Sequence, residues 1–482
     1  MEETRSYRLA KWITSQPKCL STSGKFDDSE SSINVQILRN SESILSEAEK
    51  NLVESIVGDD YCELIEQLNI ALTRDIFEGD QKSDPDVVLD RDVVSKLLHL
   101  CCAFDSIKCV SALIKGNAGA VPLIDELDAT GWSPIHRAAD MHATKCIELL
   151  FRKGARADIK TKDNHACLPL ELALSGTRMD VGWTSNDSVE DLLVCLCEKD
   201  LTAVKLLIEK TEAVAEVAYA YASQCRIVAL AALLIVDAEW INDTIPVLRP
   251  DSDSGPEEKT TVYEYVINEA LLLGQNEISS PKMYGWSESD NAGRRKLLLL
   301  EMELLQLFGA VDRRNASTAT TPLIRASQAG DEAVVRLLLK TKINVNDADE
   351  GGNSALHWSV KTYKKPRQQH TRIVCLLLRH GAQVRLTNLL GLTAVHIAAS
   401  NGNVEALKVL LSVDHGCVDC ATEMQETPLF LAVRNDYAEC AKLLMCYGAN
   451  TEALNLRLEN NNKTLILVYH SGYLSGVNMT EL

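Results

Sequence analysis

Thr321-Pro322-Leu323 is the first of four related phrases whose spacing decides the fold. The others are Ser354-Ala355-Leu356-His357, Thr393-Ala394-Val395-His396 and Thr427-Pro428-Leu429. The second residues of the four phrases lie 33, 39 and 34 positions apart, and the longest step is a normal one lengthened by about six residues near 364–369. A repeat of about 33 residues is typical of a stacked solenoid, which offers long surfaces to other molecules and seldom carries chemistry itself.

Each repeat contains two predicted helices. In the first, Thr or Ser caps the helix with its hydroxyl, and a proline at the next position lacks only an N–H group that would be unpaired there. The second carries apolar residues at three- and four-residue spacing and stops at a glycine, where a left-handed residue ends a helix. Clear examples of the second helix are Cys146–Ala155, Ile373–Ala382 and Ala441–Ala449.

These units resemble ankyrin repeats, in which Thr-Pro-Leu-His and a pair of alanines precede a Leu-Leu helix and a Gly-Ala break. Ser133–Ala139 and Thr393–Ala399 are the best copies. The resemblance implies an all-α ankyrin-repeat solenoid in which each helix–turn–helix is followed by a β-hairpin finger. Strong matches lie at 128–162, 319–350, 351–387, 388–420 and 421–455, and weaker ones at 93–127, 163–210, 211–243 and 258–315.

The chain divides into six predicted segments. Residues 1–43 form a disordered Ser-rich, acidic arm, because Asp27–Ser32 cannot bury enough apolar surface to order itself. A helical N-terminal cap follows at 44–92. Segment 93–210 contains one strong and several degenerate repeats with an insertion at 176–189, and segment 211–315 contains degenerate helical repeats with loop insertions at 248–261 and 275–294. Four strong repeats occupy 316–457, and a non-repeat tail occupies 458–482. Within 211–243 a helix pair is expected at 216–223 and 227–236.

The composition limits the classes of function. A net charge of −19 argues against a general nucleic-acid binder, which needs a basic face. Met1–Lys11 is polar and charged, and the longest clean apolar run, Ile227–Val236, is too short to span a bilayer. We therefore expect an intracellular protein, cytoplasmic, nuclear or both, whose 15 cysteines are reduced rather than paired in disulfides.

Candidate chemical sites have simpler structural explanations. His136, His357 and His396 occupy equivalent repeat positions, where the resemblance implies hydrogen bonds to neighbouring backbone. Cys417-Val418-Asp419-Cys420, near His415, has the spacing of half a zinc site, but small-residue packing explains it without a metal. The chain has no Gly-rich phosphate loop, nucleophile elbow or kinase motif. We therefore predict no enzyme activity, no cofactor and no metal.

Two features suggest binding. The basic insertion 361–372 is either a solvated loop or a contact for an acidic partner or targeting factor. By the resemblance, Leu389 and Leu390 lie at the tip of one finger, where polar residues are usual, and Trp132 lies in the matching part of another. Exposed apolar and aromatic residues favour partner contact, and the alternative is that they fold back on adjacent fingers or insertions.

The predicted function is that of a protein-binding scaffold or adaptor that recognises a partner protein through the concave and finger-tip surface. One alternative is a regulatory subunit or substrate adaptor of a kinase, phosphatase or ubiquitin ligase. Another is a truncated relative of a multidomain ankyrin protein whose zinc-finger or nucleic-acid-binding module is absent here. Carried over from family surface positions, the contact residues are Trp132, Arg137, Asp140, Met141, Ser327, Gln328, Leu389, Leu390, Leu392, Ser400, Asn401, Met424, Arg434 and Asn435.

Overall fold

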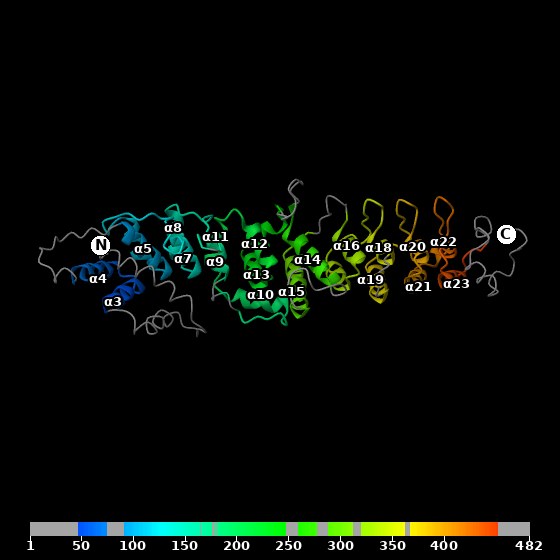
Figure 1. The fold of residues 1–482 in the computed structure, drawn as a ribbon, viewed down its shortest axis with the longest axis horizontal. Coiled ribbons are helices and arrows are strands. Elements are labelled where there is room, and N and C mark those ends of the chain that lie inside the picture. The colour runs from blue at the N-terminus through cyan, green and yellow to red at the C-terminus, as the bar shows by residue number, and fades with distance from the viewer. Residues whose placement is uncertain are drawn as a thin grey trace, which may run out of the picture. The chain divides into compact units, whose positions relative to one another are not determined.

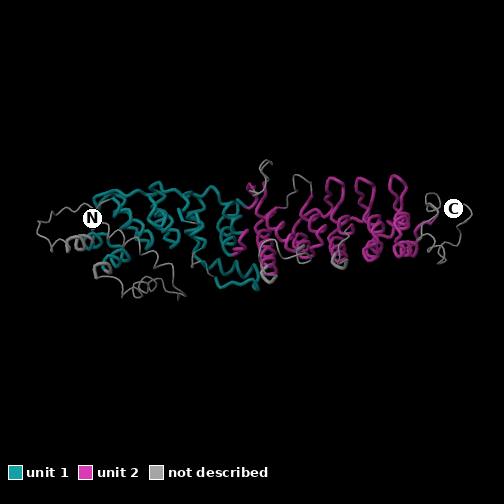
Figure 2. Tube along the Cα trace, in the orientation of Figure 1, with its two compact units in different colours: residues 1–221, 228–240 teal, residues 222–227, 241–482 magenta. Residues whose placement is uncertain are grey.

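The computed structural model describes residues 47–74, 91–163, 165–175, 179, 181–246, 259–276, 288–311, 320–361 and 367–451. The chain forms two compact units, unit 1 (residues 1–221 and 228–240) and unit 2 (residues 222–227 and 241–482), shown in Figure 2. Within the described ranges both units are mostly helical, with turns and fingers between the helices (Figure 1). The predicted arm 1–43, the tail 458–482 and positions 362–366 of the basic insertion lie outside the described residues.

Unit 1 is built from helix pairs. Its helices are α3 (Glu47–Val57), α4 (Tyr61–Arg74), α5 (Arg91–Ala103), α6 (Ile107–Ile114), α7 (Pro134–Asp140), α8 (Thr144–Arg152), α9 (Pro169–Ser175), α10 (Val189–Cys197), α11 (Thr202–Ile208) and most of α12 (Val214–Ser223) and α13 (Ile227–Val236). In one row α5 packs on α7 and α7 on α9, and in the other α4, α6, α8 and α11 follow one another. The helix pair expected within 211–243 is confirmed as α12 and α13.

Unit 2 has the same two-row plan. Its helices are α14 (Val262–Asn276), α15 (Glu288–Leu307), α16 (Pro322–Ala329), α17 (Glu332–Leu338), α18 (Ala355–Lys361), α19 (Arg367–Arg379), α20 (Ala394–Ser400), α21 (Val404–Val413), α22 (Pro428–Arg434) and α23 (Ala438–Cys446). The inner row runs α14, α16, α18, α20, α22, and the outer row runs α15, α17, α19, α21, α23. The fingers before α18, α20 and α22 project from the same side of these rows (Figure 1).

Two of the predicted loop insertions contain regular structure. β1 (Ile245–Pro246) and β2 (Lys259–Thr260) pair antiparallel, with Ile245 opposite Thr260, and so close the base of the 248–261 insertion. The loop prediction is wrong for 288–294, which form the first turns of α15. Their Ser, Asp, Asn and Gly residues suggest a loop, but acidic residues suit a helix N-terminus and the Leu-rich run that follows stabilises the helix by packing. Short 3-10 turns lie at η2 (Glu239–Asn242) and η3 (His415–Cys417).

Local sequence explains where the repeat helices begin and end. The Thr393 hydroxyl accepts the N–H of His396 at 3.4 Å, and the Thr427 hydroxyl accepts that of Phe430 at 3.3 Å. Gly154, Gly381 and Gly448 follow outer helices with φ near +90° (89°, 89° and 86°), a conformation that other residues adopt only with strain. The predicted caps and glycine stops are therefore confirmed.

The core runs between the two rows and is filled by small and aliphatic side chains. The alanine pairs 138–139 and 398–399 are fully buried, as are Leu407 and Leu410 of an outer helix. Small residues let neighbouring helices approach closely. Side chains on the rims and at the fingers lie outside this core and remain available to solvent. None of the helices in the described ranges combines the length and the apolar character needed to cross a membrane.

Candidate protein-binding surface

Four fingers share one turn geometry. In each, the N–H of the first residue donates to the carbonyl of the fifth over 2.7–3.1 Å, in the pairs Asp128–Trp132, Asp349–Asn353, Asn388–Leu392 and Thr422–Glu426. The first side chain also accepts N–H groups inside the turn, as when Oδ1 of Asn388 accepts those of Leu390 and Leu392, both at 3.0 Å. These bonds fix the backbone, so the second and third residues of each finger form its tip.

The tips of two successive fingers expose large apolar side chains. Leu389 is 79% exposed, Leu390 73% and Met424 72%, the three highest values among the large apolar side chains that the structure describes. The position expected from the sequence for the leucine pair is therefore correct. When a partner covers apolar groups that a rigid turn exposes to water, the free energy of the system falls, which favours binding.

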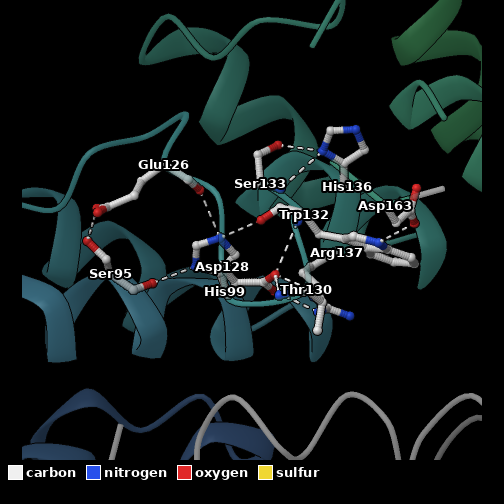
Figure 3. Close-up of polar contacts among 10 residues, drawn as sticks. All are labelled: Ser95, His99, Glu126, Asp128, Thr130, Trp132, Ser133, His136, Arg137 and Asp163. Atoms are coloured by element: carbon white, nitrogen blue, oxygen red, sulfur yellow. Dashed lines mark hydrogen bonds and ion pairs between the residues drawn. The ribbon is translucent and has the colours of Figure 1, made fainter. Parts of the chain in front are cut away.

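Trp132 and Arg137 are already occupied within their own unit (Figure 3). The indole Nε1–H of Trp132 donates to Oδ2 of Asp163 in the next finger at 3.2 Å. The Arg137 guanidinium lies 4.4 Å from the centre of the Trp132 ring and donates to Oδ2 of Asp128 at 2.6 Å. Trp132 thus folds against an adjacent finger, which was the alternative to partner contact. Arg137 is only 7% exposed, and its assignment as a contact residue is wrong because the aspartate holds it inside the repeat.

The contact residues predicted on the inner helices α7 and α16 differ in how deeply they are buried. Ser327 is fully buried, so its assignment as a contact residue is also wrong, since the small side chain sits on the packed side of α16. The adjacent Gln328 is exposed. Asp140 and Met141 at the end of α7 are half-buried, and burial raises the pKa of Asp140 against the opposing charge of Arg137.

The ends of α20 and α22 lie close to each other. Asn435 Nδ2 donates to the carbonyl of Ser400 at 3.0 Å, and Asn401 Nδ2 donates to that of Lys361 at 3.3 Å. Arg434 pairs with Glu426 at 2.7 Å. The asparagines therefore link successive inner helices, while Asn435 and Arg434 remain exposed. Leu392 is half-buried, and its carbonyl accepts a hydrogen bond from the preceding repeat.

The repeating turn, helix pair and two-row stack agree with a family comparison. Three copies of the model for ankyrin repeats match residues 60–163, 296–388 and 363–455, which together cover more than half of the chain. The chain belongs to the ankyrin repeat family. The first match begins at residue 60, inside the segment predicted as a helical cap. Ankyrin repeats generally mediate protein–protein binding.

Several curated ankyrin relatives share part of the chain. Ankyrin repeat domain-containing protein SAT10 of Stachybotrys chartarum is 32% identical over 140 residues, 29% of this chain and 7% of the relative. Nuclear factor NF-kappa-B p105 subunit of Gallus gallus is 32% identical over 159 residues, 32% of this chain and 15% of the relative. Rabankyrin-5 of Mus musculus is 28% identical over 149 residues, 31% of this chain and 12% of the relative. The chain thus spans less than a sixth of the length of each of these three.

The histidines of the ankyrin phrase link one repeat to the next. The N–H of Thr393 donates to His396 Nδ1 at 3.2 Å, so Nε2 carries the ring proton and donates to the carbonyl of Glu426 at 3.2 Å. His136 and His357 make the equivalent bonds, to the carbonyls of Cys167 and Leu392. The structural role expected for these residues is confirmed. Burial lowers the pKa of all three, to about 4 for His136.

A fourth histidine with this role was not recognised from the sequence. His99 of α5 places Nε2 3.1 Å from the carbonyl of Trp132, the residue equivalent to Cys167 in the next repeat (Figure 3). Its Nδ1 lies 2.7 Å from the carbonyl of Ser95, one helical turn back, instead of accepting from a capping residue. The available signal is its position two residues before the small pair Cys101-Cys102, where Ala138-Ala139 follow His136.

The cysteine pair near His415 makes local contacts. The Cys417 Sγ–H donates to Oδ2 of Asp414 at 3.6 Å, and burial raises the pKa of Cys417 to about 12. Cys420 Sγ–H donates to the carbonyl of Gly416 at 3.8 Å. Within the described ranges no group of three or more His, Cys, Asp or Glu side chains is arranged to hold a metal ion.

Proposed function

We propose that this chain is a protein-binding scaffold or adaptor that recognises its partner through the finger tips 389–390 and 424 and the adjoining ends of α20 and α22. The observation that carries the proposal is the exposure of Leu389, Leu390 and Met424 on neighbouring fingers. Exposed apolar side chains that cluster favour a partner more strongly than isolated ones. Gln328, Arg434 and Asn435 provide exposed polar groups on the inner helices of the same unit.

Rigidity supports the same proposal. The finger at 388–392 is closed by a backbone bond of 3.0 Å and by two bonds to the Asn388 side chain. A surface that is already ordered loses little conformational entropy when it binds. The side-chain amides of Asn401 and Asn435 also restrain the ends of α20 and α22, because each donates to a backbone carbonyl of the preceding inner helix.

The proposal includes no catalytic role for this chain. Both ring nitrogens of His136, His357 and His396 are engaged with neighbouring residues, which leaves them unsuited to proton transfer. The Cys417 thiol, with its pKa raised to about 12, is a poor nucleophile near neutral pH.

Affinity capture from a native cell extract, read by mass spectrometry, tests the proposal. The bait is the full chain, compared with Leu389→Ser/Leu390→Ser and with the control Val413→Ser, which removes an apolar side chain 60% exposed at the end of α21. We expect one set of proteins to be lost from the double variant and kept by the control, with unchanged circular dichroism. An identical set from all three baits would contradict the finger-tip surface. An enzyme that stays bound to all three would support the regulatory-subunit alternative.

A further inference from the structure

Three successive fingers of unit 2 place their tip residues in a row. The second and third residues of each finger are Glu350 and Gly351, Leu389 and Leu390, and Glu423 and Met424, and we call these six residues the finger-tip row. All six are exposed. The finger at 128–132 in unit 1 differs, since Ala129 and Thr130 occupy its tip.

Direct contacts set the order of the fingers in this row. The N–H of Leu389 donates to the carbonyl of Gly351 at 3.1 Å, and Asn388 Nδ2 donates to Oδ1 of Asn353 at 2.9 Å. On the other side, a Cβ atom placed on Gly391 would lie 3.6 Å from the backbone nitrogen of Glu423. The leucine pair therefore lies between a finger that carries Glu350 and a finger that carries Glu423.

The charge of the row is acidic and not neutralised locally. The three fingers 349–353, 388–392 and 422–426 contain four acidic residues and no lysine or arginine. Among the ion pairs of the described residues, Glu426 is taken by Arg434, whereas Glu350 and Glu423 take part in none. Arg385, three residues before the finger at 388–392, pairs with Asp414 through bonds of 2.5 and 2.9 Å. The two glutamates at the tips thus keep their charge available to a partner.

We infer that the finger-tip row binds a protein segment in which a large apolar residue is flanked by lysine or arginine. This inference rests on the proposed function and narrows it to a class of partner. The apolar residue covers Leu389, Leu390 and Met424, and the flanking cations meet Glu350 and Glu423. Charges at the rim of an interface contribute chiefly to association rate and to the choice of partner. An acidic segment meets like charges at both ends of the row, and the net charge of −19 opposes it further.

Selection from random 12-residue peptides displayed on phage, with the full chain immobilised, tests the inference. We expect the enriched peptides to carry Leu, Ile, Met, Phe or Trp with Lys or Arg within four positions. A synthetic copy of the most enriched peptide should lose about tenfold in affinity on Glu350→Lys/Glu423→Lys and bind more weakly as salt rises. The matched control, Glu198→Lys/Glu209→Lys, reverses two exposed charges at the ends of α10 and α11 and should leave affinity unchanged.

The outcomes separate the inference from the proposed function. Enriched peptides that need Leu389 and Leu390 but carry no basic residues would overturn the inference and leave the proposed function standing. Peptides whose binding survives Leu389→Ser/Leu390→Ser would contradict both. Failure to enrich any peptide would also overturn the inference, because a linear segment is the ligand it names. Circular dichroism of each variant confirms that the fold is retained.

Discussion

The Arg137 guanidinium donates two hydrogen bonds to Oδ2 of Asp128, one of 3.0 Å from Nε and one of 2.6 Å from Nη2. The two side chains are 8% and 6% exposed. Burial alone would raise the pKa of Asp128, but Arg137 and the Thr130 hydroxyl reverse this, so its pKa lies below the ordinary value. The pair joins the finger at 128–132 to the helix that follows it, and it stabilises unit 1 at any pH above the ordinary range of a carboxyl pKa.

Arg137→Ala should therefore be strongly destabilising. It leaves the Asp128 carboxylate buried without its cation, and loss of one partner from a buried pair costs about 3–5 kcal/mol. Chemical denaturation followed by circular dichroism gives the free energy of unfolding. The control is Arg156→Ala, because Arg156 forms an exposed pair with Asp158 at 2.8 Å and should matter little. Equal effects of the two substitutions would show that Asp128 finds other compensation.

The pH dependence of stability should report the buried repeat histidines. The pKa of His136 falls to about 4 in the folded protein, chiefly through burial, against about 6.5 when unfolded. The unfolded chain therefore takes up the proton first, and stability is lost as pH falls below 6.5. Between pH 7.5 and 5 this one residue should lower the free energy of unfolding by about 2 kcal/mol.

The measurement compares wild type with His136→Gln over this range. At pH 7.5 the variant should be the less stable, because it loses the link to the Cys167 carbonyl. As pH falls from 7.5 to 5, the difference in free energy of unfolding between the two proteins should narrow by about 2 kcal/mol. Only wild type contains the histidine that is protonated when unfolded and kept neutral when folded. Parallel stability curves from pH 7.5 to 5 would contradict the assignment.

These residues also show what the sequence could and could not predict. The phrase Ser133-Pro134-Ile135-His136 predicts a cap, a helix start and a buried histidine, because each depends on neighbours within one turn. The same local signals place Leu389 and Leu390 at a finger tip. Arg137 pairs with Asp128 only when the finger folds back on its helix. The two residues are nine positions apart, so the sequence around Arg137 does not predict that it is buried. His99 was missed because its helix lacks the Thr-Pro start.

A buried carboxyl group in unit 2 leads to the opposite pH dependence, with stability lost as pH rises. Glu301 of α15 is fully buried, and neither carboxyl oxygen has a hydrogen-bond partner within the described part of the chain. Burial raises the pKa of Glu301 well above its ordinary value, and the charge of Arg294 opposes this only in part. The folded protein therefore favours the neutral acid, and stability is lost as pH rises above the ordinary carboxyl pKa.

Glu301→Met should stabilise unit 2 at pH 7 by about 1–3 kcal/mol, because it replaces an unpaired polar group with an apolar one of similar length. The gain should shrink toward pH 4, where wild type carries its proton in both states. The control is Glu303→Met, which removes a partially exposed partner of Lys340 and should bring no gain. Denaturation midpoints at pH 4 and pH 7 provide the comparison. A loss of stability at pH 7 would mean that Glu301 has a compensating partner.

The position of Leu389 depends on a glycine in the preceding finger. Gly352 has a φ of +74°, and a Cβ atom there would lie 2.8 Å from the backbone nitrogen of Leu389. Gly381 has a similarly left-handed φ of +89°, but a Cβ atom there would meet nothing within 4 Å. Each alanine substitution should lower stability by about 1 kcal/mol because of the left-handed backbone conformation. Only the substitution at 352 also forces two fingers apart.

Gly352→Ala should therefore destabilise unit 2 more than Gly381→Ala and should break the bond from the Leu389 N–H to the Gly351 carbonyl. Hydrogen exchange read by mass spectrometry tests this directly, since peptides that contain Leu389 should exchange faster in Gly352→Ala and at the wild-type rate in Gly381→Ala. The leucine tip would then lose its fixed place beside Glu350, and capture of any partner that needs Leu389 should weaken with it. Equal exchange in both variants would show that the finger holds its position without this contact.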